Sequence, residues 1–76
     1  MITYQTKKET LYCAEIGFYT TFGIAVSEII NGQTILIEVI SDVFLDGTIA
    51  ESFIEMCNQF HLDRIHLHDV IEDWSA

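Results

Sequence analysis

Residues 22–40, FGIAVSEIINGQTILIEVI, decide the fold of this 76-residue chain. Two apolar, β-branched runs flank Asn31 and Gly32, and Asn-Gly between such runs is the strongest short-range signal for a β-hairpin. Both residues tolerate positive φ, as a type I′ turn requires at its two central positions. The turn pairs Ile30 with Gln33 and thereby predicts the register of the hairpin. One face of the predicted hairpin is apolar and is expected to form the core, namely Phe22, Ile24, Val26, Ile35, Ile37 and Val39.

The opposite face of the predicted hairpin mixes polar and apolar side chains. A single helix covers only one face of a small sheet, so the apolar side chains on this second face are expected to meet water or a partner. They are Ala25, Ile29, Leu36 and Ile40.

A third strand is predicted before the hairpin. In residues 10–18 the side chains of Tyr12, Ala14, Ile16 and Phe18 fall on one side with period two, which is typical of a strand. Residues 19–21 are interpreted as a short connection, so that three consecutive strands form an antiparallel meander in the order 1-2-3. Residues 1–10 are mostly polar, and we expect either a frayed start or a fourth, N-terminal strand there.

The apolar period changes after the hairpin, and residues 48–60 are predicted to form an amphipathic helix on one face of the sheet. Thr48 with Glu51 matches the capping-box pattern, and Asp46 is the alternative N-cap. Ile54 lies to one side of the expected core stripe. The stripe itself consists of Ile49, Phe53, Met56, Cys57 and Phe60.

A second, shorter helix is predicted over residues 66–74. Its apolar residues follow the spacing i, i+3, i+4, i+7 of one helix face, at Leu67, Val70, Ile71 and Trp74. A helix this short is marginal alone and must dock, either at an edge of the sheet or on its other face. The chain is therefore predicted to be a single α+β domain over residues 1–76. It combines a three-stranded antiparallel meander, one amphipathic helix and a short C-terminal helix.

The C-terminal segment IHLHDVIEDW resembles the end of a family of short bacterial proteins described as a domain of unknown function. The matching positions are Phe22-Gly23-Ile24 with Val26 in the hairpin, then His66, Leu67, Asp69, Val70, Ile71, Glu72, Asp73 and Trp74. The resemblance spans residues 10–75 and implies a few strands, a helix and a terminal helical segment. It implies no activity.

Charge restricts the kinds of partner. Twelve acids against three basic residues give a net charge of −9, and residues 42–76 hold eight of the acids. Such a chain is repelled by phosphate backbones and anionic membranes, so direct nucleic-acid binding is disfavoured, whereas a basic protein partner is compatible. No run approaches the ~18 apolar residues of a membrane span, and the N-terminus lacks the apolar segment of a signal peptide. We therefore expect a cytoplasmic protein whose Cys13 and Cys57 are reduced.

Few residues have the pattern of a chemical site. His61, His66, Asp69 and Asp73 are the candidate metal ligands, since three of them fall near one face of the predicted terminal helix. No His-Glu-x-x-His or Cys-x-x-Cys motif brings such ligands together, and no nucleophile elbow or phosphate loop is present. We expect no cofactor and no enzymatic activity.

The pattern favours a non-enzymatic protein–protein interaction or regulatory module, and the spare apolar face makes a homodimer one expected assembly. The alternative is an acidic inhibitor that mimics nucleic acid and occupies a basic groove of a protein. A histidine and aspartate metal site is the third hypothesis. The candidate interaction residues are Ile29, Leu36, Ile40, Ile54, Asp69, Glu72, Asp73 and Trp74.

Overall fold

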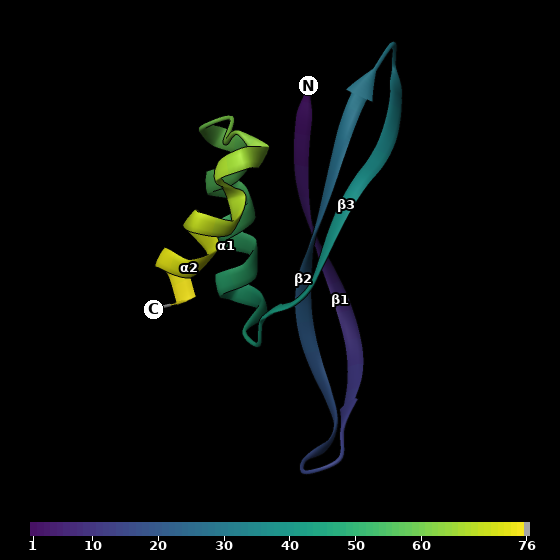
Figure 1. Ribbon diagram of the computed structural model, residues 1–76, viewed down its shortest axis with the longest axis vertical. Coiled ribbons are helices and arrows are strands. Elements are labelled where there is room, and N and C mark those ends of the chain that lie inside the picture. The colour runs from purple at the N-terminus through teal and green to yellow at the C-terminus, as the bar shows by residue number, and fades with distance from the viewer. Residues whose placement is uncertain (76) are drawn as a thin grey trace.

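Three long strands form one antiparallel sheet, and the helices follow them in the chain (Figure 1). The computed structural model describes residues 1–75. The elements are β1 (Ile2–Cys13), β2 (Gly17–Ile30), β3 (Gln33–Phe44), α1 (Gly47–Gln59), the 3₁₀ turn η1 (Arg64–His66) and α2 (Leu67–Ser75). The strand order is β1-β2-β3, which confirms the predicted α+β class and the meander.

The β2–β3 turn forms at Asn31 and Gly32 as predicted. Their φ angles are 52° and 79°, and both lie in the left-handed region that a type I′ turn requires. The pairs from Ile30–Gln33 to Ser27–Leu36 follow the predicted register.

The register shifts further from the turn, because β3 carries two irregularities. Ile24 pairs with Ile40 and Ala25 pairs with Val39, so the predicted pairing of Ile24 with Val39 is wrong. One extra residue in a strand turns the following side chains to the opposite face of the sheet. Ile40 consequently packs against the core and Val39 is exposed, the reverse of the predicted assignment.

The first strand also differs from the prediction. β1 begins at Ile2 and ends at Cys13, so the residues considered for a fourth strand belong to it, and the sheet of residues 1–75 has three strands. The Ile16 N–H donates to the Cys13 carbonyl at 3.2 Å, and Gly17 follows with a φ of 82°. This turn replaces the predicted connection at residues 19–21, which are part of β2.

The core lies between the sheet and the helices, which Figure 1 shows on the same side of the sheet. Asp46 is the N-cap of α1, since its Oδ1 accepts hydrogen bonds from the Thr48 and Ile49 N–H groups at 2.8 and 3.3 Å. The buried apolar residues of the core are Tyr4, Ile24, Val26, Phe44, Ala50, Phe53, Ile54, Cys57 and Leu67.

The buried stripe of α1 is rotated relative to the predicted one. Ile54 is buried, whereas Ile49 and Phe60 are exposed. The helix contacts the sheet on one side, and its Phe53 ring meets the Trp74 ring of α2 edge-on at a centroid distance of 5.3 Å. The buried residues of α1 are Ala50, Phe53, Ile54 and Cys57, which follow the spacing i, i+3, i+4, i+7 of a single helix face.

Tyr4 connects β1 to the helices at three points. Its backbone N–H donates to Asn58 Oδ1 at 2.9 Å, and Asn58 Nδ2 donates to the Tyr4 carbonyl at 2.9 Å. The Tyr4 hydroxyl donates to the Leu62 carbonyl at 2.7 Å. The end of α1 therefore occupies the outer edge of β1, where another strand would otherwise pair.

We expect the Asn58→Ala variant to lower the free energy of unfolding by about 1–2 kcal/mol, because two hydrogen bonds to a partly buried strand are lost. Urea unfolding followed by circular dichroism measures the change. Gln59→Ala is the control, since Gln59 is an exposed neighbour on the same helix, and we expect a change within about 0.5 kcal/mol. Equal effects of the two variants would contradict the assigned role of Asn58.

Stability should fall at alkaline pH. Burial raises the pKa of the Cys57 thiol from 9.0 to about 11, and burial is also the largest cause that raises the pKa of Tyr4. Between pH 9 and pH 11 the unfolded chain releases the Cys57 proton while the folded chain keeps it, so the free energy of unfolding decreases as pH rises. The contribution of Cys57 is on the order of 2 kcal/mol. Urea midpoints at pH 8 and pH 11 should therefore differ less in Cys57→Ala than in the unmodified chain, and an equal difference in both proteins would be inconsistent with this assignment.

Candidate functional site

A groove of about 650 Å³ separates the sheet from the start of the C-terminal helical segment. β1, β2 and β3 contribute one wall, and the segment from Asp63 to His68 contributes the other. The residues that line the groove are Ile2, Glu28, Ile37, Glu38, Asp63, Arg64, Ile65 and His68.

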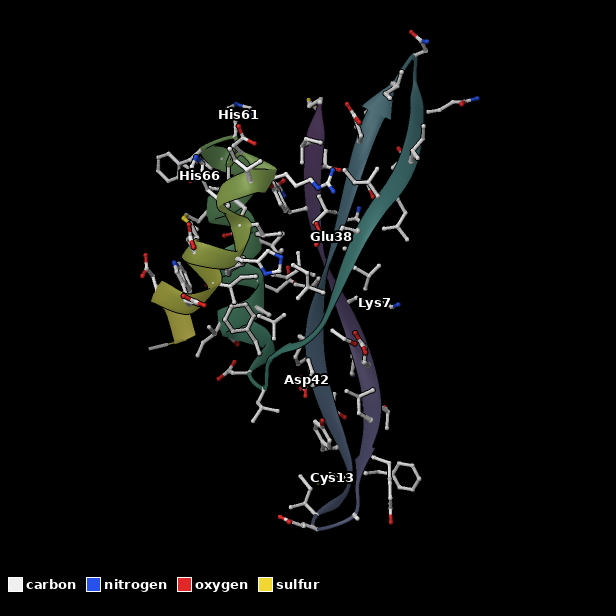
Figure 2. All side chains as sticks on the ribbon, in the orientation of Figure 1. Lys7, Cys13, Glu38, Asp42, His61 and His66 are labelled. Carbon is white, nitrogen blue, oxygen red and sulfur yellow. The ribbon has the colours of Figure 1, made fainter. Side chains whose placement is uncertain are left out.

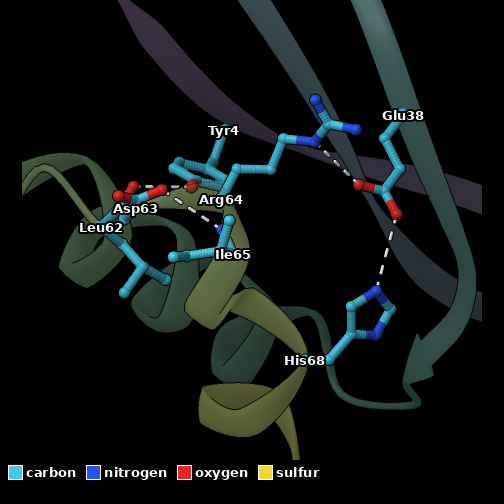
Figure 3. Close-up of polar contacts among 7 residues, drawn as sticks. All are labelled: Tyr4, Glu38, Leu62, Asp63, Arg64, Ile65 and His68. Atoms are coloured by element: carbon cyan, nitrogen blue, oxygen red, sulfur yellow. Dashed lines mark hydrogen bonds and ion pairs between the residues drawn. The ribbon is translucent and has the colours of Figure 1, made fainter.

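Glu38 links the two walls, as Figure 3 shows. Arg64 Nε donates to Glu38 Oε1 at 3.4 Å, and His68 Nε2 lies 3.5 Å from Glu38 Oε2. All three side chains are accessible to water and both distances are long, so these contacts add little stability. Their effect is to orient the Glu38 side chain toward the helical wall, which is the segment from Asp63 to His68.

The helical wall is fixed by Asp63 and Tyr4. Asp63 Oδ1 accepts a hydrogen bond from the Ile65 N–H at 3.3 Å, and the Asp63 carbonyl accepts one from the His66 N–H at 3.0 Å. The neighbouring Leu62 carbonyl is bonded to the Tyr4 hydroxyl (Figure 3). This local turn leaves the Ile65 side chain 77% exposed at the groove.

The chemistry of the groove suits binding. Its lining combines the apolar side chains of Ile2, Ile37 and Ile65 with three carboxylates, one guanidinium and one imidazole. Within residues 1–75, the groove lining includes no hydroxyl or thiol side chain that could act as a nucleophile. The arrangement can accept apolar and basic groups of a ligand.

The candidate metal ligands do not assemble into a site. Across residues 1–75, no group of three or more His, Cys, Asp or Glu side chains is placed to hold a metal ion. Figure 2 shows His61 and His66 at one end of the helical segment. Asp63 caps the turn at which His66 lies.

Two of the predicted interaction residues belong to the core side of the protein. Ile54 is buried in α1, and Ile40 packs against the core because of the register shift in β3. Their prediction as free surface residues is therefore wrong.

The other predicted interaction residues remain at least partly accessible. Leu36 is exposed on β3, and Ile29 is half-buried, with its backbone N–H bonded to the Met1 carbonyl at 2.8 Å. Asp69, Glu72 and Asp73 are exposed on α2, and Trp74 keeps part of its ring in water. These residues come from different elements, and the groove lining includes none of them.

Sequence reasoning missed a second exposed apolar surface at the β1–β2 turn. Tyr12, Ile16 and Phe18 are all exposed there, although their alternation resembled that of a core strand. Gly17 was the available signal, since an isolated glycine inside an alternating pattern indicates a break in the strand.

A cluster of hydrogen-bonded polar side chains connects the two-stranded ribbon of β1 and β2 to β3. Asp42, which has a φ of 57°, accepts hydrogen bonds from the Tyr19 hydroxyl at 3.0 Å and from the buried Thr21 hydroxyl at 2.7 Å. The hydrogen bond to Asp42 is the main cause that raises the pKa of Tyr19. Ser41 Oγ donates to Glu9 Oε2 at 2.6 Å, and Glu9 Oε1 is buried without a partner in the described residues. These contacts connect β1 and β2 to β3 near the point where β3 ends, and they orient the part of the β1–β2 ribbon that extends beyond β3.

No helix within residues 1–75 is long and apolar enough to cross a membrane. Comparisons with family models, curated proteins and solved structures found no match to this chain. The resemblance of the C-terminal segment to a bacterial family stays a prediction.

We expect Zn²⁺ or Ni²⁺ at tenfold excess to leave the melting temperature within about 2 °C of the metal-free value, because a ligand that does not bind the folded state does not stabilise it. Differential scanning fluorimetry measures the shift. A larger rise that disappears in His66→Ala and persists in His68→Ala would establish a metal site and contradict this expectation.

Proposed function

We propose that this protein is a non-enzymatic interaction module that binds a partner protein through the groove between the sheet and the C-terminal helical segment. The observation that carries the proposal is the lining of the groove, in which three isoleucines stand beside three carboxylates. Apolar side chains that stay exposed beside orienting polar groups are characteristic of recognition surfaces.

The charge of the groove supports a partner segment with basic and apolar side chains. Glu28, Glu38 and Asp63 outnumber the one cation of the lining, Arg64, and the whole chain carries −9. This field favours the approach of lysine and arginine side chains. Ile65 is the apolar anchor of the groove, because it is the most exposed of the three isoleucines.

The net charge also supports the alternative function, an acidic inhibitor that occupies the basic groove of a nucleic-acid-binding protein. Such binding would rest on exposed acids spread over both helices, which are Glu51, Glu55, Asp69, Glu72 and Asp73. Contacts between exposed charges are screened by salt, whereas burial of Ile65 in a partner is not. Salt dependence therefore separates the two functions.

The experiment is affinity capture from an extract of the native host, with quantitative mass spectrometry of the bound proteins. Three baits are compared, namely the unmodified chain, Ile65→Ser and the control Leu45→Ser, which removes an equally exposed side chain outside the groove. We expect a partner that is retained by Leu45→Ser and lost with Ile65→Ser, and a drop of at least about tenfold in the affinity of the purified partner for Ile65→Ser.

The outcome at high salt tests the proposal again. Retention of the partner at about 0.5 M salt favours the groove, and loss of all captured proteins at that concentration favours the acidic inhibitor. A partner bound equally by Ile65→Ser and Leu45→Ser would overturn the assignment to the groove.

A further inference from the structure

The β1–β2 ribbon projects beyond the rest of the molecule. Its strands pair from Lys7–Gly23 to Cys13–Gly17, and residues 7–23 are called the arm here. β3 reaches only the base of the arm, where Phe44 pairs with Phe22. Figure 1 shows both helices beside the other half of the sheet, and Figure 2 shows Cys13 near the far end. A two-stranded ribbon without a covering layer is marginally stable in water.

The arm exposes three large apolar side chains close to its turn. Tyr12 and Phe18 stand directly opposite each other, with ring centroids 5.1 Å apart and an interplanar angle of 61°. They are 65% and 77% exposed, and Ile16 in the turn that connects the two strands is 69% exposed. The three side chains leave roughly 450 Å² in water. Complete burial of these side chains in both copies would remove at most roughly 900 Å² from water, so an interface of ~1,000 Å² also needs neighbouring residues of the arm.

Charge indicates which partner this surface fits. Within the arm, Lys7 and Lys8 balance Glu9 and Glu15, so its net charge is zero. The rest of the chain holds ten acids and Arg64 and therefore carries the whole charge of −9. Two copies of this chain repel each other wherever their bodies meet. The neutral arm lies at one end of a molecule whose longest dimension is 44 Å, so contact between arms keeps the acidic bodies apart.

The order of charges along the arm is self-complementary. Lys8, Thr10 and Tyr12 share one face of β1, since alternate residues of a strand point the same way. Lys8 stands four residues from Tyr12 toward the base of the arm, and Glu15 lies in the turn at its tip, beyond the last strand pair Cys13–Gly17. Two arms that cross in opposite directions at their aromatic pairs bring Lys8 of each copy toward Glu15 of the other.

We propose that two copies of this chain form a dimer through their arms, antiparallel and related by a two-fold axis, with the Tyr12 and Phe18 rings of each copy packed against those of the other. An isologous contact of this kind closes on itself and gives a dimer only. The arm is separate from the groove, so this dimer and the binding of a partner protein in the groove are independent.

Size-exclusion chromatography with light scattering on the full chain tests the proposal. We expect a mass of twice 8.7 kDa at micromolar concentration and a single-copy mass for the Tyr12→Ser, Phe18→Ser double variant. Phe60→Ser is the matched control, because Phe60 is 70% exposed on the helical body, and it should remain a dimer. An unmodified chain that stays monomeric up to about 0.5 mM, or a dimer that Phe60→Ser breaks and the double variant does not, would overturn the proposal.

A charge exchange tests the orientation without removing apolar side chains from the ribbon. Lys8→Glu alone and Glu15→Lys alone should each weaken the dimer about tenfold, and the combination should restore it. Far-UV circular dichroism verifies that each variant is folded. If the combined variant instead weakens the dimer by the sum of the two single effects, the antiparallel arrangement is excluded.

Discussion

The hydrogen bonds between the Asn58 side chain and the Tyr4 backbone are the constraint on which the rest of the structure depends. β1 is an edge strand, and the outward N–H and C=O groups of an edge must bond to water or to a protein group. The Asn58 amide offers one acceptor and one donor, as a neighbouring strand would. It thereby closes the edge at Tyr4 and fixes the end of α1 against the sheet.

The contact between Asn58 and Tyr4 also determines the geometry of the groove. Asn58 lies in the last turn of α1, and Leu62 follows it by four residues with its carbonyl on the Tyr4 hydroxyl. Asp63, Arg64 and Ile65 come directly afterwards, so their positions relative to β3 are determined by a side chain in β1. The Glu38 contacts with Arg64 and His68 then act on a wall that is already placed, which is why long, exposed contacts suffice there.

The parts of the fold that sequence predicted are those with a local physical signal. Asn31-Gly32 determines its own turn and the four pairs beside it. The i, i+3, i+4, i+7 spacing that begins at Leu67 predicted a second helix, and α2 forms there with Leu67 buried and Trp74 40% exposed. The register of β3 has no such signal, because residues 35–40, ILIEVI, are apolar at five of six positions and a slip of one residue leaves the pattern almost unchanged. The groove was missed for a related reason. Glu28 and Glu38 are neighbours only in the shifted register of β2 and β3, and Asp63 reaches them only through the tertiary contact of Tyr4 with Leu62.

The arm is uncovered because helix α1 is much shorter than strand β2. α1 has 13 residues and spans roughly 20 Å at 1.5 Å per residue, whereas β2 has 14 residues and spans roughly 45 Å at 3.3 Å per residue. One helix of this length covers less than half of the ribbon, and η1 and α2 turn back along α1 rather than extending its cover. The apolar residues at the uncovered end alternate as core residues do, so their pattern alone does not distinguish a buried strand from an exposed one. Tyr12 and Phe18 therefore contact each other but stay 65% and 77% exposed in the part of the chain that the structure describes, because the helices pack beside the other half of the sheet (Figure 1).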